Sequence, residues 1–459
     1  MKIIQKRKVA QTTKITILSF LTLVLLGGVL LNLPICNVKE TTFLDSLFTS
    51  AASVCVAGLS TVTAAEQYTL IGKIIMLCLI QVGALGFIVM ISAFYTLIKK
   101  KISYKEQLTI SASLGSESNL ENIRKLIVRV IKYTVIFEFL GAIILSIRFI
   151  PMFGIIEGIG QSIFTSVSAF CNCGYDILGP NSLKSFATDY LVTGTCGILT
   201  ILGSLGFIVW NEIIDKRREK KKYKLSNKKI WLTLSVHTKL VLVMTAVMIV
   251  FGTLGFMAIE YNNDLTLGQY NFGEKLFISV FHGISARTTG MAAVDLMSMS
   301  DAGKFFTAIL MFIGGAPGST AGGIKTVTFA VLLLAMLNSI SGNKNVTVFN
   351  KEITIEIVKK SISILFLALF ITCATTMILS IMNPQIAFVN IMFEVISALA
   401  TCGYSLGITA SLTPASKVLL ILIMFVGRVS TVTMTMAITG QKFKHNNIIQ
   451  YPKADINVG

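Results

Sequence analysis

Residues 390–405, NIMFEVISALATCGYS, decide the fold, because three earlier stretches of the chain repeat their pattern. The aligned stretches are DSLFTSAASVCVAGLS (45–60), QSIFTSVSAFCNCGYD (161–176) and FISVFHGISARTTGMA (277–292). Their glycines, Gly58, Gly174, Gly290 and Gly403, follow one another at intervals of 116, 116 and 113 residues. A regular period of this kind indicates copies of one structural unit.

A second motif repeats at the same period, inside the apolar run that follows each glycine segment. It reads VGALG (82–86), LGSLG (202–206), IGGAP (313–317) and VGRVS (426–430). Each unit therefore consists of an apolar span, a short half-helix, an extended glycine segment and a second apolar span. Four copies predict eight membrane crossings and four re-entrant pore helices, arranged with pseudo-symmetry around one central pore.

The composition agrees with a membrane protein, since 54% of the 459 residues are hydrophobic and 14% are charged. Runs such as ITILSFLTLVLLGGVLLNLP and ILFLALFITCATTMILSIM are long enough to cross about 30 Å of hydrocarbon as helices. We therefore expect an all-α polytopic membrane fold. The expected units are 1–100, 101–215, 216–345 and 346–459, with pore segments at 45–63, 161–177, 276–295 and 390–409.

The net charge of +18 is concentrated in short basic segments, which favours cytoplasmic loops over nucleic-acid binding. These segments are the N-terminal MKIIQKRK, the loops IKKKISYK and DKRREKKKYKLSNKK, residues 344–360 and the C-terminal tail. Their positions predict that both termini are cytoplasmic. The eight cysteines have no paired spacing, and no histidine lies near the CNC sequence at 171–173, so reduced thiols are expected.

The glycine segments explain how the chain could turn back inside a membrane. Non-helical backbone at that depth survives only where it is buried or lines water. Glycine keeps such backbone narrow and permits positive φ. Four segments around one axis would direct carbonyl oxygens at a common line, where such oxygens replace the hydration shell of a cation. The alternative is that each glycine only permits close helix packing.

The residues around the second and fourth glycines resemble a known ion filter. FCNCGYD (170–176) and ATCGYS (400–405) look like degenerate forms of the potassium-channel sequence TVGYG. Four joined copies with one such glycine each resemble the Trk/Ktr/HKT superfamily of potassium transporters. Because the chain starts at the first unit, it is most similar to the membrane subunit of the bacterial Ktr system.

The resemblance implies which residues line the selectivity filter and bind potassium. They are Val56, Ala57 and Gly58; Asn172, Cys173 and Gly174; Thr288, Thr289 and Gly290; and Thr401, Cys402 and Gly403, followed by Leu59, Tyr175, Met291 and Tyr404. HKT-type sodium carriers have serine at the first glycine, so Gly58 points to potassium. One strong site near the glycines is expected. The hydroxyls of Thr288 and Thr401 either contribute to it or serve only in packing.

The segment GGAPGSTAGGIKT (314–326) interrupts the second apolar span of the third unit. It is not a phosphate-binding G-x-x-x-x-G-K-[ST] loop, because Ile324 displaces Lys325 by one position and the flanks are apolar spans. Pro317 breaks the helix, and the glycines allow hinging. The resemblance implies an intramembrane gate below the filter. Its expected residues are Gly314, Gly315, Ala316, Pro317, Gly318, Ser319, Thr320, Gly322, Gly323, Lys325 and Arg428.

Basic residues near these segments have different expected roles. Arg428 lies at the equivalent depth of the fourth unit, where a charge is costly and usually functional. We expect it to repel potassium and to donate hydrogen bonds to carbonyls of the gate, rather than to reach the membrane surface. Arg287 pairs with an acidic residue such as Glu394 or faces the outer vestibule. Lys325 contacts the gate or faces the cytoplasm.

These features predict a potassium-translocating subunit of the cytoplasmic membrane, driven by electrochemical gradients, and not an enzyme. Potassium is the transported substrate and no organic cofactor is expected. A general monovalent cation channel or a sodium-coupled symporter of the same superfamily is the alternative. The resemblance also implies a homodimer and a cytosolic RCK-type regulatory subunit that binds nucleotide. Residues 216–229 are the candidate docking surface, with positive-inside topology and contact with anionic lipids as the other explanation.

Overall fold

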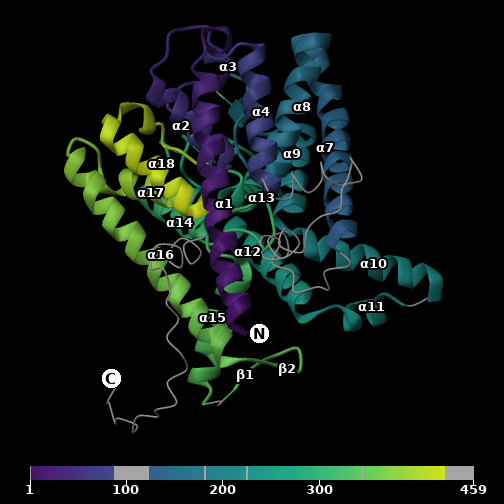
Figure 1. Ribbon diagram of the computed structural model, residues 1–459. Coiled ribbons are helices and arrows are strands. Elements are labelled where there is room, and N and C mark those ends of the chain that lie inside the picture. Colours follow the sequence, from purple (N-terminus) through teal and green to yellow (C-terminus); the bar gives the residue numbers. More distant parts are fainter. Residues whose placement is uncertain (1, 87–122, 180–181, 224–225, 343–344, 430–459) are drawn as a thin grey trace.

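The computed structural model describes residues 2–86, 123–179, 182–223, 226–342 and 345–429, which form a bundle made almost entirely of helices (Figure 1). The chain passes through this bundle as four consecutive units with the same order of elements. In each unit a long helix leads to a short helix, a glycine segment and a further apolar helix. The order of elements therefore follows the repeat in the sequence.

The first two units span residues 2–223. The first contains α1 (Lys2–Leu31), η1 (Pro34–Cys36), α2 (Phe43–Val54), α3 (Ala64–Gln67) and α4 (Leu70–Leu85). The second contains α7 (Ile123–Phe153), α8 (Ile155–Cys171), η3 (Ser182–Phe186), α9 (Tyr190–Ser204) and α10 (Phe207–Tyr223). Helix α10 continues past residue 215, where the sequence suggested a boundary between units.

The last two units span residues 226–429. The third contains α11 (Asn227–Thr233), α12 (Val236–Glu260), α13 (Phe272–Thr288), α14 (Asp301–Phe312) and α15 (Thr326–Ile340). A small antiparallel hairpin, β1 (Val346–Val348) and β2 (Lys351–Ile353), connects it to the fourth unit. That unit contains α16 (Ile355–Met382), α17 (Phe388–Ala400), η4 (Thr409–Ser411) and α18 (Pro414–Val429).

The short helices α2, α8, α13 and α17 have recognisable ends. Thr42 accepts a hydrogen bond from the Asp45 amide at the start of α2, and Asn271 and Glu274 form a capping box at the start of α13. At the opposite ends of α8 and α17, Asn172 and Thr401 take left-handed φ values of 59° and 48°. The chain therefore changes direction sharply as it leaves α8 and α17 and enters the glycine segments.

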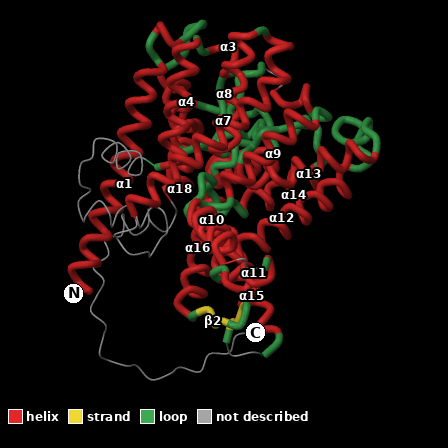
Figure 2. The backbone as a smooth tube through the Cα atoms, turned by 90° about the vertical axis from the view of Figure 1, so that its right-hand side faces the viewer, coloured by secondary structure: helices red, strands yellow, loops and turns green. Residues whose placement is uncertain are grey.

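The four units contact one another in a closed ring. The second apolar helix of each unit packs against the short helix of the next: α4 on α8, α9 on α13 and α14 on α17. Helix α18 of the fourth unit packs on α2 of the first. Figure 2 shows loop segments passing through the interior of the helix bundle, rather than only over its surface. The ring encloses these loops, which include the glycine segments.

The second apolar helices are shorter than we expected. Among the described residues, only α7, α12 and α16 are long and apolar enough to span a bilayer alone, and α9 with α10 forms a pair bent by 93°. Helices α4, α9 and α14 have 16, 15 and 12 residues, fewer than the roughly 20 that a crossing needs. They end early because Gly86 and Gly206, with φ of 86° and 88°, turn the chain, and because a loop begins after Phe312.

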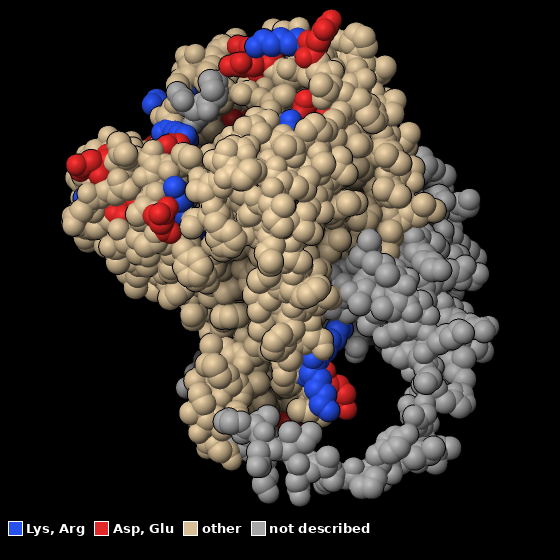
Figure 3. Space-filling model, turned by 90° about the vertical axis from the view of Figure 1, so that its left-hand side faces the viewer, with Lys and Arg blue, Asp and Glu red and all other residues tan. Residues whose placement is uncertain are grey.

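The outer surface of the bundle suits a lipid environment. Large apolar side chains are exposed on the long helices, among them Phe139, Ile147, Phe366 and Phe370. One face of the molecule is a broad uncharged surface, with Lys, Arg, Asp and Glu gathered above and below it (Figure 3). Such a band is what hydrocarbon requires, because charged side chains are costly at the bilayer centre.

Candidate functional site

The four aligned glycines lie against one another's segments, and we call this arrangement the glycine ring. Each glycine faces the backbone carbonyl of the residue that precedes the next glycine. The closeness can be expressed as the distance from a Cβ atom built on each glycine to that carbonyl oxygen. This distance is 2.0 Å for Gly58 and Cys173 O and 2.1 Å for Gly174 and Thr289 O. It is 2.4 Å for Gly290 and Cys402 O and 2.9 Å for Gly403 and Ala57 O. The sequence of contacts returns to the first unit, so the ring is closed.

The glycine ring gathers backbone oxygens in one place. The Cβ position at Gly403 is also 3.2 Å from both Cys173 O and Thr289 O, although these carbonyls belong to the second and third units. The four glycines have φ between 67° and 102°, which side chains other than glycine rarely adopt. Carbonyl oxygens held at such a point present partial negative charge to a cation.

The residues two positions before the glycines are buried around this ring. Val56 and Asn172 have positive φ, as Thr401 does, while Thr288 is the last residue of α13. The hydroxyl oxygens of Thr288 and Thr401 are buried and have no hydrogen-bond partner among the described residues. Buried polar groups normally find a partner, so the two unpaired hydroxyls are notable, although that of Thr401 lies against Gly322 of the segment 314–326.

The tyrosines that follow the second and fourth glycines contact the preceding unit by hydrogen bonds. Tyr175 donates a hydrogen bond of 2.6 Å to the carbonyl of Leu59. The Tyr404 hydroxyl lies 3.4 Å from His282 Nδ1, and the other nitrogen of His282 lies 3.0 Å from the Thr307 hydroxyl. The sequence analysis did not single out His282. The one sign of it in the sequence is that a histidine stands at the position where the first two units have Ser50 and Ser166.

The loop at 313–325, between α14 and α15, has an ordered path. Gly314 N donates to Ile324 O at 2.9 Å, which closes the loop on itself. Ala316 N donates to Ser204 O at 2.9 Å, so the loop is also joined to the break between α9 and α10. Although five of its residues are glycine, the loop is held at both ends and at its middle.

The loop lies directly against the glycine ring. An added Cβ at Gly322 would be 1.9 Å from Thr401 Oγ1, and the Thr320 hydroxyl accepts a hydrogen bond of 2.6 Å from Asn172. In the other units, the second-motif glycine contacts the short helix itself, as Gly83 does with its Cβ position 2.1 Å from Val54 O. Gly314 instead approaches Gly322 O, at 2.0 Å. In the third unit the loop therefore takes the place that the short helix has beside the second-motif glycine in the other units.

Arg428 joins the loop to the first unit. Its guanidinium donates to the carbonyl of Thr320 and to the carbonyls of Gly83 and Ala84, the last at 2.9 Å. The side chain thus points into the bundle rather than toward a membrane surface. The bond to the Thr320 carbonyl is of the kind that the sequence suggested, whereas the other two carbonyls belong to α4.

Arg287 has neither of the roles that we considered. It is only 3% exposed, and it donates a 3.2 Å hydrogen bond to the carbonyl of Gly314. Glu394 instead accepts hydrogen bonds from the Ser405 hydroxyl and the Leu406 amide, at 2.6 and 2.9 Å. Arg287 lies in the last turn of α13, from where its side chain reaches the start of the loop.

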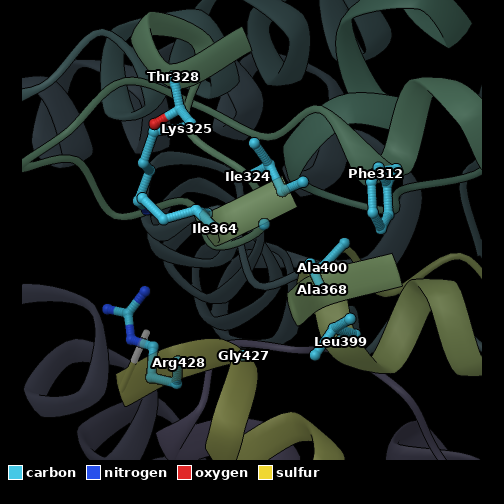
Figure 4. Close-up of a pocket in the computed structure, with 11 residues that line it drawn as sticks. Phe312, Ile324, Lys325, Thr328, Ile364, Ala368, Leu399, Ala400, Gly427 and Arg428 are labelled. Atoms are coloured by element: carbon cyan, nitrogen blue, oxygen red, sulfur yellow. The ribbon is translucent and has the colours of Figure 1, made fainter. Parts of the chain in front are cut away.

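Lys325 is a loop contact that also lines a cavity. Its ammonium group donates to Ala321 O at 2.6 Å. The cavity, of about 80 Å³, lies between the third and fourth units beside Ala400. Figure 4 shows Lys325 and Arg428 on one side of it and Phe312 and Leu399 on the other. The loop therefore borders open space on the side of the fourth unit.

A buried carboxyl group also escaped the sequence analysis. Glu138, in the middle of α7, is 8% exposed and accepts a hydrogen bond of 3.2 Å from Gln81 of α4. The thiol of Cys171, three residues before Gly174, lies 3.7 Å from its other oxygen. Its signal was a single acidic residue within the apolar run YTVIFEFLGAIILSI, a feature that is rare in membrane helices.

The fold is that of a mostly helical protein with apolar helices of membrane type, and backbone segments from its four units contact one another at the glycine ring. Residues 3–445 match the TrkH family model, described as a cation transport protein, and the chain belongs to this family. It is 34% identical to the potassium/sodium uptake protein NtpJ of Enterococcus hirae, over all of both chains. It is 33% identical to the Ktr system potassium uptake protein B of Bacillus subtilis, over 99% of this chain and all of that one.

A solved structure has the same fold. The potassium transporter TrkH from Vibrio parahaemolyticus superimposes with a TM-score of 0.71, covering 93% of this chain and 84% of that one at 14% sequence identity. The resemblance noted from the sequence is thereby confirmed at the level of family and fold.

Proposed function

We propose that this protein carries potassium into the cell across the cytoplasmic membrane, as the ion-translocating subunit of a Ktr-type system. The observation that supports this best is the glycine ring, where backbone carbonyls of all four units meet. Potassium exchanges its hydration water for carbonyl oxygens readily, and such sites need no charged side chain. The expected filter residues and the unpaired hydroxyls of Thr288 and Thr401 surround this point.

The relatives support potassium as the transported ion. Proteins named for potassium uptake match the whole length of this chain at 32–34% identity. One of them is named for both potassium and sodium, so sodium transport is the alternative to be tested. A membrane potential supplies about 2.3 kcal/mol per charge for each 100 mV, which can drive uptake without chemistry on this chain.

The loop at 313–325 acts as the gate in this proposal. Its backbone lies against the glycine ring, and the positive charge of Arg428 is fastened to it. A cation that has passed the ring would meet this charge and the loop backbone. Opening would move the loop away from Asn172 and Arg428, and the adjacent cavity offers space on the side of the fourth unit.

The wider assembly is part of the same proposal, supported by relatives whose names refer to a Ktr system. We propose a homodimer with both termini in the cytoplasm and a cytosolic RCK-type subunit that controls the gate. The basic segment 216–229, which begins within α10, is the candidate contact for that subunit. No organic cofactor is proposed for this chain.

Uptake of radioactive rubidium by a host that lacks its own potassium uptake systems tests this function. Cells that make the protein should grow at low potassium and accumulate rubidium, and excess potassium should inhibit accumulation more strongly than excess sodium. Gly194→Ser serves as a control, because its Cβ would meet nothing within 4 Å. Correctly inserted protein that gives neither growth nor uptake would contradict the proposal.

A further inference from the structure

The side chain of Asn172 connects the glycine ring to the loop. Its amide nitrogen donates to the Thr320 hydroxyl at 2.6 Å, and its amide oxygen accepts from the Thr289 hydroxyl at 2.7 Å. The Thr320 hydroxyl in turn lies 3.3 Å from the carbonyl of Phe170. One fully buried side chain thus joins the second glycine segment, the third glycine segment and the loop.

Asparagine suits this position better than the residues at the aligned positions of the other units. An amide offers both donors and an acceptor, so it can hold a hydroxyl on either side. Val56 offers neither, and Thr288 and Thr401 offer one hydroxyl each. Asparagine also tolerates the left-handed conformation that this turn requires, with φ of 59°. The second unit therefore carries a connection that the aligned residues of the other units are not equipped to make.

We propose that Asn172 is a specificity-determining residue whose side chain is held in place by the loop, so that opening the gate changes the selectivity of the filter. This rests on the proposed function. If Thr320 moves away with the loop, the amide nitrogen of Asn172 loses its 2.6 Å partner and keeps only the weaker 3.3 Å bond to the carbonyl of Phe170, which is costly unless the side chain turns. Turning it removes the bond from the Thr289 hydroxyl, which keeps its 2.9 Å contact with the Thr200 hydroxyl. The carbonyl of Thr289 lies against Gly174 in the ring, so this change reaches the filter.

Removal of the Thr320 hydroxyl leaves the backbone contacts of that residue in place. Its carbonyl accepts from Arg428, and its amide donates to Gly203 O at 3.4 Å. Thr320→Val keeps the shape and both backbone contacts, but it can neither accept from Asn172 nor donate to the carbonyl of Phe170. Thr320→Ser keeps the hydroxyl. A comparison of these two variants isolates the hydroxyl, with its two bonds to the second unit, from the backbone contacts of the loop.

The test measures rubidium and sodium fluxes into liposomes that contain the purified full-length chain. We expect Thr320→Val to lower the ratio of rubidium to sodium flux by about threefold to tenfold, the range that one hydrogen bond supports. Thr320→Ser should keep the ratio of the unmodified protein. Thr372→Val is the matched control, because the Thr372 hydroxyl bonds only to the carbonyl of Ala368 in its own helix, at 2.9 Å.

Two other results would overturn the inference. Thr320→Val could raise both fluxes equally with the ratio unchanged, in which case Thr320 belongs to the gate alone. Alternatively, Thr320→Ser could lower the ratio as much as Thr320→Val, which would make the shape of the loop responsible. Gly290→Ser separates these from a failure of the proposed function: if it also leaves the ratio unchanged, the ring is not the filter.

Discussion

The glycine ring and the loop at 313–325 are both glycine-rich backbone inside a helical bundle, yet they are held in different ways. In the ring, each glycine contacts a backbone carbonyl of the next unit so closely that an added Cβ would lie 2.0–2.9 Å from the carbonyl oxygen. The loop is attached to other units partly by side chains, through Thr320 with Asn172 and Arg428. The ring depends on the packing of four units, whereas these contacts of the loop depend on a few exchangeable hydrogen bonds.

This difference suggests a division of tasks. Backbone that fits against backbone cannot loosen unless whole units move, so the ring suits a binding site of fixed dimensions. Hydrogen bonds from Arg428 and Asn172 can be replaced by water at modest net cost, because each contributes only about 0.5–3 kcal/mol. The loop therefore suits a moving part. Changes in the ring should alter selectivity, and loss of the Arg428 contacts of the loop should alter flux. The contact between Thr320 and Asn172 joins the two regions, so its loss should alter selectivity.

The largest effect is expected from a side chain placed in the ring. In Gly290→Ser, the new Cβ would lie 2.4 Å from Cys402 O at a φ of 71°. The carbonyls must move apart, so discrimination between potassium and sodium should fall at least about tenfold, since left-handed backbone alone costs roughly 1–2 kcal/mol for such a residue. Competition of rubidium uptake by sodium measures this.

Gly194→Ser is the control for that variant, because it makes the same chemical change in α9, where the added Cβ would meet no described atom within 4 Å beyond its chain neighbours and the backbone of its own helix. Its uptake and selectivity should match those of the unmodified protein. If Gly290→Ser kept full discrimination while the protein remained folded, the distinction between a rigid ring and a movable loop would lose its basis.

A smaller effect is expected when the loop loses its cation. Arg428→Gln removes the charge and most of the hydrogen bonds to Thr320 and to the first unit. Because hydrogen bonds from charged groups contribute about 1.5–3 kcal/mol, unstimulated rubidium flux into liposomes should rise about tenfold. Arg148→Gln is the matched control, since Arg148 pairs with Asp189 at 2.8 Å and is exposed. Lower or unchanged flux in Arg428→Gln would contradict a gate at this position.

The sequence predicted the order of the elements because the repeat records it. The interval of 116 residues was enough to align Gly58 with Gly174, and the structure brings their segments together. The early end of the second apolar helices was also visible, since Gly86 and Gly206 occupy the same place in the second motif. The sequence analysis placed that motif within an uninterrupted second span, whereas the positive φ values of Gly86 and Gly206 show that the helix ends there.

Side-chain partners could not be predicted in the same way. Asn172 and Thr320 are 148 positions apart, and nothing local in either stretch indicates the other. Arg287 illustrates the limit for charges, because a residue at the end of a buried helix can point up or down the bundle. Its bond to Gly314 O depends on where the loop of the same unit returns, which only the folded chain determines.

The smallest effect is expected outside both regions, at an ion pair between the second and third units. Partial burial raises the pKa of Asp295, but hydrogen bonds from Lys184 and Ser298 more than offset this, so its pKa lies below the ordinary 3.8. A lowered pKa means that the carboxylate stabilises the fold above pH 3.8 and that this contribution is lost as the pH falls further. Because both side chains of the pair are about 40% exposed, we expect the pair to contribute less than about 1 kcal/mol to the free energy of unfolding.

Thermal unfolding in detergent should show Asp295→Asn slightly less stable than the unmodified chain at neutral pH, with the difference in stability closing in acid. A gap that persisted in acid would mean that the substitution acts through packing, and a change in selectivity would mean that the ring is less isolated from its surroundings than its backbone contacts indicate.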